Sequence, residues 1–132
     1  MKTDSLRLTA VLPAAPATVQ AAWLDGALHA AMTGAPATGE ARVGARFTAW
    51  EDYIEGENLE VAAGRVLQSW RTTQFPPGAP NSRLEVQFGE AVGGTELTLI
   101  HTQIPLGQGD AYEEGWEEYY FAPMRAYFGA AT

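Results

Sequence analysis

The stretch DAYEEGWEEYYFAPMRAYF, residues 110–128, decides the fold that this sequence predicts. At about 100° per residue, its aromatic and apolar side chains fall on one face of a helix, and its glutamates and Arg125 fall mostly elsewhere. That face carries Tyr112, Trp116, Tyr119, Tyr120, Pro123 and Tyr127, and is widened by Phe121, Met124 and Phe128. We predict that Asp110 caps the helix with Glu113 as the reciprocal acceptor, and that Gly129 ends it. A helix so rich in aromatics requires a large apolar surface to lie on.

Earlier runs of the chain supply this surface, because they alternate apolar and polar residues as β-strands do. The predicted strands are 5–12, 38–42, 45–51, 53–61, 65–74, 82–90 and 95–104. Short separators rich in turn-forming residues join most of them, so neighbouring strands are expected to be antiparallel. Between the first two runs, Pro16 suits the first turn of a helix that reaches Leu24. Asp25 suits the cap of a second helix that ends at Gly34.

The predicted fold class is α+β, in one domain covering residues 1–132. A curved antiparallel sheet of six to seven strands carries two short helices after its first strand. The long C-terminal helix lies over the concave face of the sheet. Pro123 removes a hydrogen bond to the carbonyl of Tyr119, which favours a kink, and a kinked helix over a curved sheet leaves a cavity.

Composition excludes several classes of function. The chain has 132 residues, a net charge of −8, no cysteine and 46% hydrophobic residues. A surface with this negative net charge repels phosphate backbones and anionic lipids, which argues against nucleic acid or membrane as the main partner. The first residues form neither a signal peptide nor a spanning helix, so we expect a cytoplasmic protein. Two histidines without metal-ligand spacing predict no metal and no cofactor.

Two sets of ionisable residues have a functional and a structural interpretation. His101 shares strand parity with Leu97 and Leu99, so it could face the cavity as an acid, base or ligand anchor. The alternative is a core histidine satisfied by a neighbour, and His29 is expected to be structural or solvated. The carboxylates on one predicted hairpin could act in pairs, but their alternation favours a solvated strand face. They are Glu51, Asp52, Glu55, Glu57 and Glu60.

The aromatic residues are the more informative set. Buried Tyr and Trp side chains require partners for their O–H and N–H groups, and the C-terminal stretch holds more of them than an ordinary core. The alternative is a large aromatic core. We predict a cavity for an apolar or amphipathic small molecule. Its candidate lining residues are Trp50, Trp70, His101, Tyr112, Trp116, Tyr119, Tyr120 and Met124.

Five stretches also carry a family resemblance. They are PAAPATVQAAW at 13–23, VGARFTAWEDYIEGENLEV at 43–61, RVLQSWR at 65–71, GGTELTLIHTQIP at 93–105 and YEEGWEEYYFAPMRAYF at 112–128. This order resembles the START-like (SRPBCC, or Bet v 1-like) superfamily, and within it the group related to the C-terminal domain of the activator of Hsp90 ATPase. The resemblance implies a helix-grip fold with an internal hydrophobic cavity and carries over no catalytic residues. The eukaryotic co-chaperone has a further N-terminal domain that contacts Hsp90, for which we expect no room in this chain.

Three function classes follow. A binding domain for a hydrophobic or amphipathic small molecule is the leading interpretation. The second is an enzyme of the cyclase, aromatase or hydrolase kind, using a cavity His, Tyr or Glu. The third is a protein-interaction module with a chaperone partner.

Overall fold

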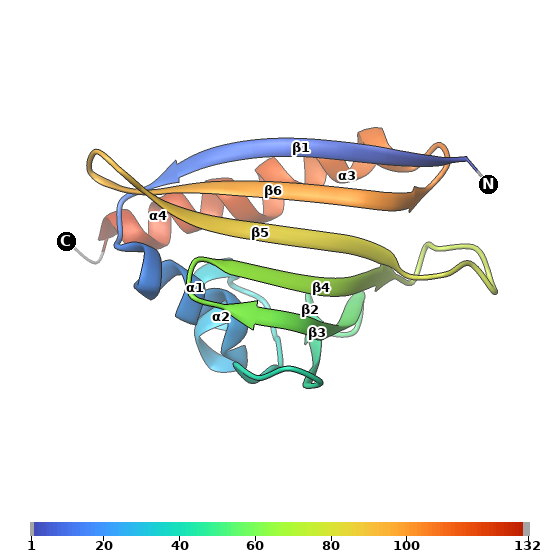
Figure 1. Cartoon of the computed structure of the whole chain (residues 1–132), viewed down its shortest axis with the longest axis horizontal. Coiled ribbons are helices and arrows are strands. Elements are labelled where there is room, and N and C mark those ends of the chain that lie inside the picture. Colours follow the sequence, from blue (N-terminus) through green and yellow to red (C-terminus); the bar gives the residue numbers. More distant parts are fainter. Residues whose placement is uncertain (1, 131–132) are drawn as a thin grey trace.

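The computed structural model describes residues 2–130 as one antiparallel sheet that grips a long helix (Figure 1). The strands are β1 (Thr3–Leu12), β2 (Arg46–Ala49), β3 (Ile54–Ala62), β4 (Arg65–Thr72), β5 (Ser82–Ala91) and β6 (Gly94–Pro105). The helices are α1 (Pro16–Leu24), α2 (Gly26–Thr33), α3 (Gly109–Trp116), the π-helical turn η1 (Glu117–Phe121) and α4 (Ala122–Ala130). Together, α3, η1 and α4 form one continuous stretch, here called the C-terminal helix. The sheet order is β1-β6-β5-β4-β3-β2 with every pair antiparallel, which confirms the predicted helix-grip fold.

The strand predicted at residues 38–42 is wrong. Thr38 makes only a single bridge, to Thr48, and the following residues form a loop. The buried amide of Asn58 donates from Nδ2 to the carbonyl oxygens of Glu40 and Arg42, at 2.9 and 3.0 Å. A side chain therefore satisfies part of this backbone where a neighbouring strand was expected.

The cap predicted at Asp110 is also wrong. The C-terminal helix begins one residue earlier, at Gly109, and no hydrogen bond from its N-cap side chain is present. A carboxylate from the other end of the chain takes that place. Asp4 Oδ2 accepts hydrogen bonds from the backbone N–H groups of Gly107 and Gly109, at 2.9 Å each. Those donors have no partner within the helix and the helix dipole favours a negative charge there, so β1 fixes the position of the helix start.

The π turn keeps one side of the C-terminal helix turned inward over its whole length. Every fourth residue is buried: Tyr112, Trp116, Tyr120, Met124 and Phe128. In an ideal α-helix a four-residue step overshoots one turn by about 40°, so such a row would wind away from the sheet. In η1 the N–H of Ala122 bonds to the carbonyl of Glu117, five residues back, which underwinds the helix and offsets the drift.

Pro123 lies just after this π turn. The irregularity expected from its missing N–H takes the form of η1, and the helix continues beyond it. The end predicted at Gly129 agrees with the structure to within one residue, because α4 is described through Ala130.

The C-terminal helix does not cover the sheet evenly. It packs against β1 and against α2, and in Figure 1 it runs behind β1 and β6. Trp23 of α1 is buried beside it, and stacks on Trp116 with ring centroids 6.1 Å apart. The other side of the sheet, where β4, β3 and the short β2 lie, is less closely covered by α3, and the candidate site is found there.

Candidate functional site

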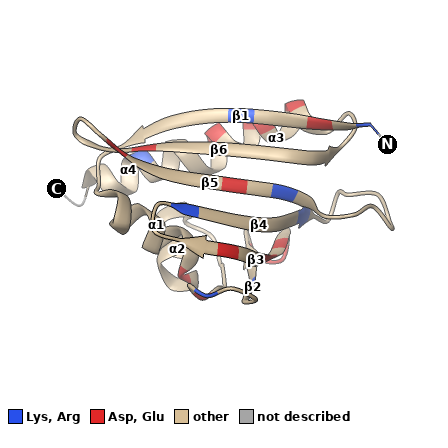
Figure 2. Cartoon of the chain, in the orientation of Figure 1, with Lys and Arg blue, Asp and Glu red and all other residues tan. Residues whose placement is uncertain are grey.

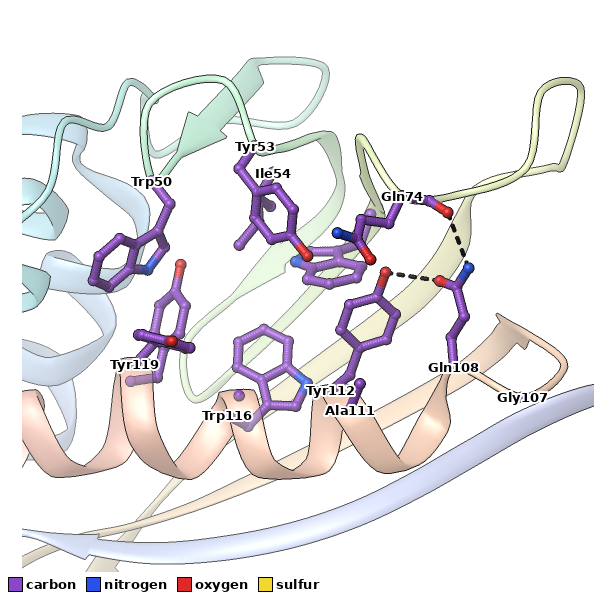
Figure 3. Close-up of a pocket in the computed structure, with 13 residues that line it drawn as sticks. Trp50, Tyr53, Ile54, Gln74, Gly107, Gln108, Ala111, Tyr112, Trp116 and Tyr119 are labelled. Carbon is purple, nitrogen blue, oxygen red and sulfur yellow. Dashed lines mark hydrogen bonds between the residues drawn. The ribbon is translucent and has the colours of Figure 1, made fainter.

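A cavity of about 710 Å³ lies between the first half of the C-terminal helix, the β2–β3 turn and the end of β4 (Figure 3). Six of the eight candidates named from the sequence line it: Trp50, Trp70, Tyr112, Trp116, Tyr119 and Tyr120. The other lining residues are Tyr53, Ile54, Gln74, Gly107, Gln108, Ala111 and Gly115. The remaining two candidates, His101 and Met124, are fully buried in the core and do not line this cavity.

Four of the seven additional lining residues were missed for identifiable reasons. Tyr53, Ile54 and Gln74 stand at turns or strand ends, whose place relative to the helix depends on the sheet pairing. Gly115 had a detectable signal, because a glycine inside a helix suggests close approach by backbone or ligand. A Cβ built at Gly115 meets only Tyr119 Cδ2, at 3.9 Å, so the helix backbone there is bare toward the cavity.

Tyr112 fixes the beginning of the helix to the sheet. Its hydroxyl donates to Gln108 Oε1 at 2.8 Å and accepts from Thr72 Oγ1 at 2.7 Å. Gln108 Nε2 in turn donates to the carbonyl of Gln74 at 3.0 Å (Figure 3). Burial raises the pKa of the Tyr112 hydroxyl, and the hydrogen bond with Thr72 partly offsets this. The cavity therefore meets the ring of Tyr112, while its oxygen is held by the protein.

Trp116 is held by a chain of hydrogen bonds through His101. Its indole N–H donates to His101 Nδ1 at 3.2 Å, and His101 Nε2 lies 2.8 Å from Ser82 Oγ. Ser82 donates its own proton to the carbonyl of Trp70 at 2.9 Å, so His101 is the donor to Ser82. This requires the neutral Nε2–H tautomer, and burial lowers the pKa of His101 to about 3. Both ring nitrogens are engaged, so His101 is a core histidine rather than an acid or base facing the cavity.

Tyr120 is held by the second histidine. His29 Nδ1 donates to the carbonyl of Trp23 at 2.9 Å, and His29 Nε2 accepts from the Tyr120 hydroxyl at 2.8 Å. Burial lowers the pKa of His29, which the hydrogen bond to Trp23 opposes, and burial raises the pKa of Tyr120 strongly. The expectation that His29 is structural agrees with this geometry.

These contacts change the interpretation of the aromatic row. The O–H and N–H groups of Tyr112, Trp116 and Tyr120 were taken as a sign of a polar cavity, but each is paired inside the protein. The rings form a packed wall, in which the Trp116 ring lies 5.5 Å from that of Trp70 and 4.9 Å from that of Tyr120. We call Trp70, Tyr112, Trp116 and Tyr120 the inner wall.

The opposite side of the cavity is formed by the rim, which we define as Trp50, Tyr53 and Tyr119. The backbone at Trp50 and Glu51 is left-handed, with φ of 52° and 60°, a conformation that is strained for residues with a Cβ. The Trp50 and Tyr119 rings meet edge to face, with centroids 5.2 Å apart (Figure 3). Tyr119 and Tyr53 are 50% and 38% exposed, which places the mouth of the cavity between them. The indole Nε1 of Trp50 is buried without a hydrogen-bond partner.

Charge is kept away from this cavity. Within the described part of the chain, its lining contains no Asp, Glu, His, Lys or Arg. The acidic residues are spread over the strands, the loops and the C-terminal helix (Figure 2), and Glu113, Glu114, Glu117 and Glu118 are exposed. Glu51, Asp52, Glu55 and Glu60 are exposed and Glu57 is half-buried, as expected for a mostly solvated strand face. The lining thus offers no pair of carboxylates for hydrolysis.

Two features are absent from residues 2–130. No group of three His, Asp or Glu side chains in this range is arranged to hold a metal ion. None of the described helices is long and apolar enough to cross a membrane.

Comparisons with known proteins give consistent matches. Residues 13–129 match the family described as Activator of Hsp90 ATPase homolog 1-like protein. The human protein Activator of 90 kDa heat shock protein ATPase homolog 1 is 30% identical over 100 residues, which are 75% of this chain and 29% of that protein. This chain therefore matches less than a third of that relative's length.

Solved structures share the fold. The crystal structure of an HSP90 activator from Plasmodium falciparum has a TM-score of 0.84 at 21% identity, covering 95% of this chain and 96% of that one. A protein from Mesorhizobium loti has a TM-score of 0.80 at 17% identity, with 98% and 99% of the two chains covered. At these identities the likeness concerns the fold alone.

Proposed function

The chain belongs to the Activator of Hsp90 ATPase homolog 1-like family, and we propose that it binds an apolar or amphipathic small molecule in the cavity beneath its C-terminal helix. The observation that carries this proposal is the cavity of about 710 Å³ bounded by aromatic rings. Its size falls within the range of roughly 300–1,000 Å³ that is usual for small-molecule sites. A space of this size exceeds the packing defects of an ordinary protein core.

The construction of the inner wall also supports binding. Tyr112, Trp116 and Tyr120 each have a hydrogen bond to another protein side chain, so their rings have fixed positions before any ligand arrives. A wall that is already ordered loses little side-chain entropy when it binds. The ligand then meets flat apolar surfaces, which suit an aromatic or aliphatic group.

The fluorophore N-phenyl-1-naphthylamine, which is uncharged, provides a direct test. We expect saturable fluorescence enhancement with the wild-type protein. Gly115→Leu places a side chain into open cavity space, because a Cβ there contacts only Tyr119 at 3.9 Å. This variant should weaken binding at least about tenfold, which corresponds to roughly 1.4 kcal/mol of lost binding free energy.

A matched control is available on the same helix. Gly129→Leu also replaces a helix glycine, and among the described residues a Cβ there would meet Pro13 Cγ, at 3.9 Å. It lies outside the cavity lining and should leave the dissociation constant unchanged within about twofold. Absence of saturable binding to the wild type would refute the proposal. If the Gly115→Leu variant binds the fluorophore as tightly as the wild type, the binding site lies on another part of the surface.

A second candidate function is supported by the relatives. The human relative and the Plasmodium falciparum structure are both described as activators of Hsp90, so this domain is a candidate to contact an Hsp90-type ATPase. The discriminating measurement is ATP turnover by an Hsp90 with and without the protein. We expect an increase if the chain acts as its relatives do, and the Gly115→Leu variant should keep that increase if the cavity is not the contact.

A further inference from the structure

The polar groups around the cavity indicate which small molecule it takes. Building on the proposed function, we propose that the ligand is a flat, uncharged aromatic compound carrying a carbonyl oxygen, and that the indole N–H of Trp50 donates a hydrogen bond to this oxygen. Trp50 thereby determines specificity, while the inner wall provides the apolar contact.

The first observation is an unmatched donor. Trp50 Nε1 is enclosed in the structure yet makes no hydrogen bond to the protein, and it is the one such side-chain atom found in residues 2–130. A buried donor without an acceptor is unfavourable, and native proteins seldom retain one without a reason. Three polar groups of the inner wall show the contrast, since those of Tyr112, Trp116 and Tyr120 have protein partners. An oxygen supplied by a ligand would complete the pairing.

The second observation is the cover over this donor. The Tyr119 ring meets the Trp50 indole edge to face, with centroids 5.2 Å apart. In Figure 3 the indole nitrogen lies on the side of Trp50 that is turned toward Tyr119. Tyr119 is itself 50% exposed, so its ring can swing outward at small cost in buried area. Outward movement of Tyr119 uncovers the N–H at the cavity mouth.

The third observation concerns charge. The described lining holds neither a basic nor an acidic side chain, and the whole chain has a net charge of −8. An anionic ligand would lose its hydration without gaining a counter-ion, and would be repelled by the protein as a whole. A cation would lack a carboxylate partner inside the cavity. The buried part of the ligand is therefore uncharged, and a carbonyl supplies the acceptor without a charge.

The fourth observation concerns shape. Gly115 leaves the helix backbone bare within the lining, and the rings of Trp70 and Trp116 stand 5.5 Å apart beside it. Aromatic faces and bare backbone favour a planar ring system, which can stack on both. The polar donor lies on the rim and the apolar faces lie on the inner wall, so the carbonyl is directed toward the mouth.

Three naphthalenes separate these features experimentally. 2-Acetylnaphthalene carries the carbonyl, 2-isopropenylnaphthalene replaces its oxygen by a CH₂ group in nearly the same shape, and 2-naphthoate adds a negative charge. Their dissociation constants are measured by displacement of N-phenyl-1-naphthylamine from the wild-type protein. We expect the ketone to bind about five- to tenfold more tightly than the hydrocarbon, as for one hydrogen bond, and the carboxylate to bind most weakly.

Single substitutions show which residue causes the preference for the ketone over the hydrocarbon. Trp50→Phe keeps an aromatic ring but removes the N–H, and should reduce the preference for the ketone over the hydrocarbon to less than about twofold. Tyr53→Phe and Tyr119→Phe remove the other rim donors and should keep the preference. Tyr119→Ala removes the covering ring and should speed association of the ketone in stopped-flow measurements.

A spectroscopic measurement on the unmodified chain covers the case in which Trp50→Phe does not fold. In a ¹H–¹⁵N spectrum, the ketone should move the Trp50 indole proton downfield, and the hydrocarbon should not.

The outcomes distinguish this inference from the function on which it rests. If the fluorophore binds but neither neutral naphthalene displaces it, the inference about the ligand is refuted while the proposed binding function stands; if the fluorophore itself does not bind, both are refuted. If the ketone and the hydrocarbon bind equally well, the cavity binds small molecules but Trp50 is not a donor to them. A preference that persists in Trp50→Phe, or that is lost in Tyr53→Phe, assigns the donor elsewhere. If 2-naphthoate binds most tightly, the inference that the ligand is uncharged is wrong.

Discussion

The inner wall and the rim of the cavity are both aromatic, but they are built differently. In the inner wall every tyrosine hydroxyl has a partner, and Trp116 donates to a buried histidine. In the rim, Trp50 has strained backbone and an unpaired N–H, while Tyr53 and Tyr119 are partly exposed. The same residue types thus form a rigid inner wall and a rim that can rearrange. Hydrogen-bond pairing, rather than aromatic content, separates the structural part of this site from the part able to respond to a ligand.

The largest effect is expected for Trp116→Ala. Trp116 is 3% exposed and is packed against Trp23, Trp70 and Tyr120. Its truncation should lower the free energy of unfolding by about 3–5 kcal/mol, as for large residues in cores. Tyr119→Ala in the rim should change it by less than about 1 kcal/mol. Urea unfolding curves measure both. Equal losses would remove the distinction between inner wall and rim.

The next effect concerns a single hydroxyl in each region. Tyr120→Phe leaves His29 Nε2 buried without its donor, which should cost about 1–3 kcal/mol of stability. Tyr119→Phe removes an exposed hydroxyl and should stay within about 0.5 kcal/mol of the wild type. Thermal and urea melts of the pair provide the measurement. A stable Tyr120→Phe variant would show that the histidine contact does not stabilise the inner wall.

The inner wall should also be sensitive to acid. In the folded state the pKa of His101 is lowered to about 3, whereas an unfolded histidine titrates near about 6.5. Between these values the unfolded chain binds more protons, so stability is present above pH 6.5 and is lost progressively as the pH falls toward 3.

Between about pH 7.5 and 5.5, this linkage amounts to a loss of about 1.4 kcal/mol from His101. His29 adds a loss of the same sign, because its pKa is also lowered. Urea unfolding at the two pH values tests this, with His101→Gln as the control that should flatten the dependence. A pH dependence unchanged in that variant would mean that His101 does not titrate as described.

The smallest effect is a gain in stability. Gly115→Ala adds a Cβ to open space and removes a flexible residue from a helix, so it should stabilise the protein by about 0.5–1 kcal/mol. Gly109→Ala is the contrasting variant, because its Cβ would come within 2.9 Å of the Asp4 carboxylate, and it should destabilise. Differential scanning calorimetry gives both signs. A destabilised Gly115→Ala variant would show that the space beside Gly115 is filled rather than open to the cavity.

Much of the fold followed from local patterns. Strand alternation, turn residues and the aromatic row between 110 and 128 predicted the helix-grip fold, and the structure confirms it. The wrong cap at Asp110 and the wrong strand at residues 38–42 share one cause. In both, distant side chains, Asp4 and Asn58, satisfy backbone groups that a local interpretation gave to near neighbours.

For the site, the sequence by itself determined that a row of Tyr and Trp side chains would face the sheet, because helical periodicity depends only on residues a few positions apart. Only the tertiary structure decided what each polar tip does. Tyr120 meets His29 91 residues away along the chain, Tyr112 meets Thr72 40 residues away, and Trp50 meets no acceptor at all. Pairing of this kind depends on the angle at which helix and sheet cross and on the register of the strands. Those are properties of the assembled core, because a hydrogen bond requires two groups to come within about 3 Å of each other.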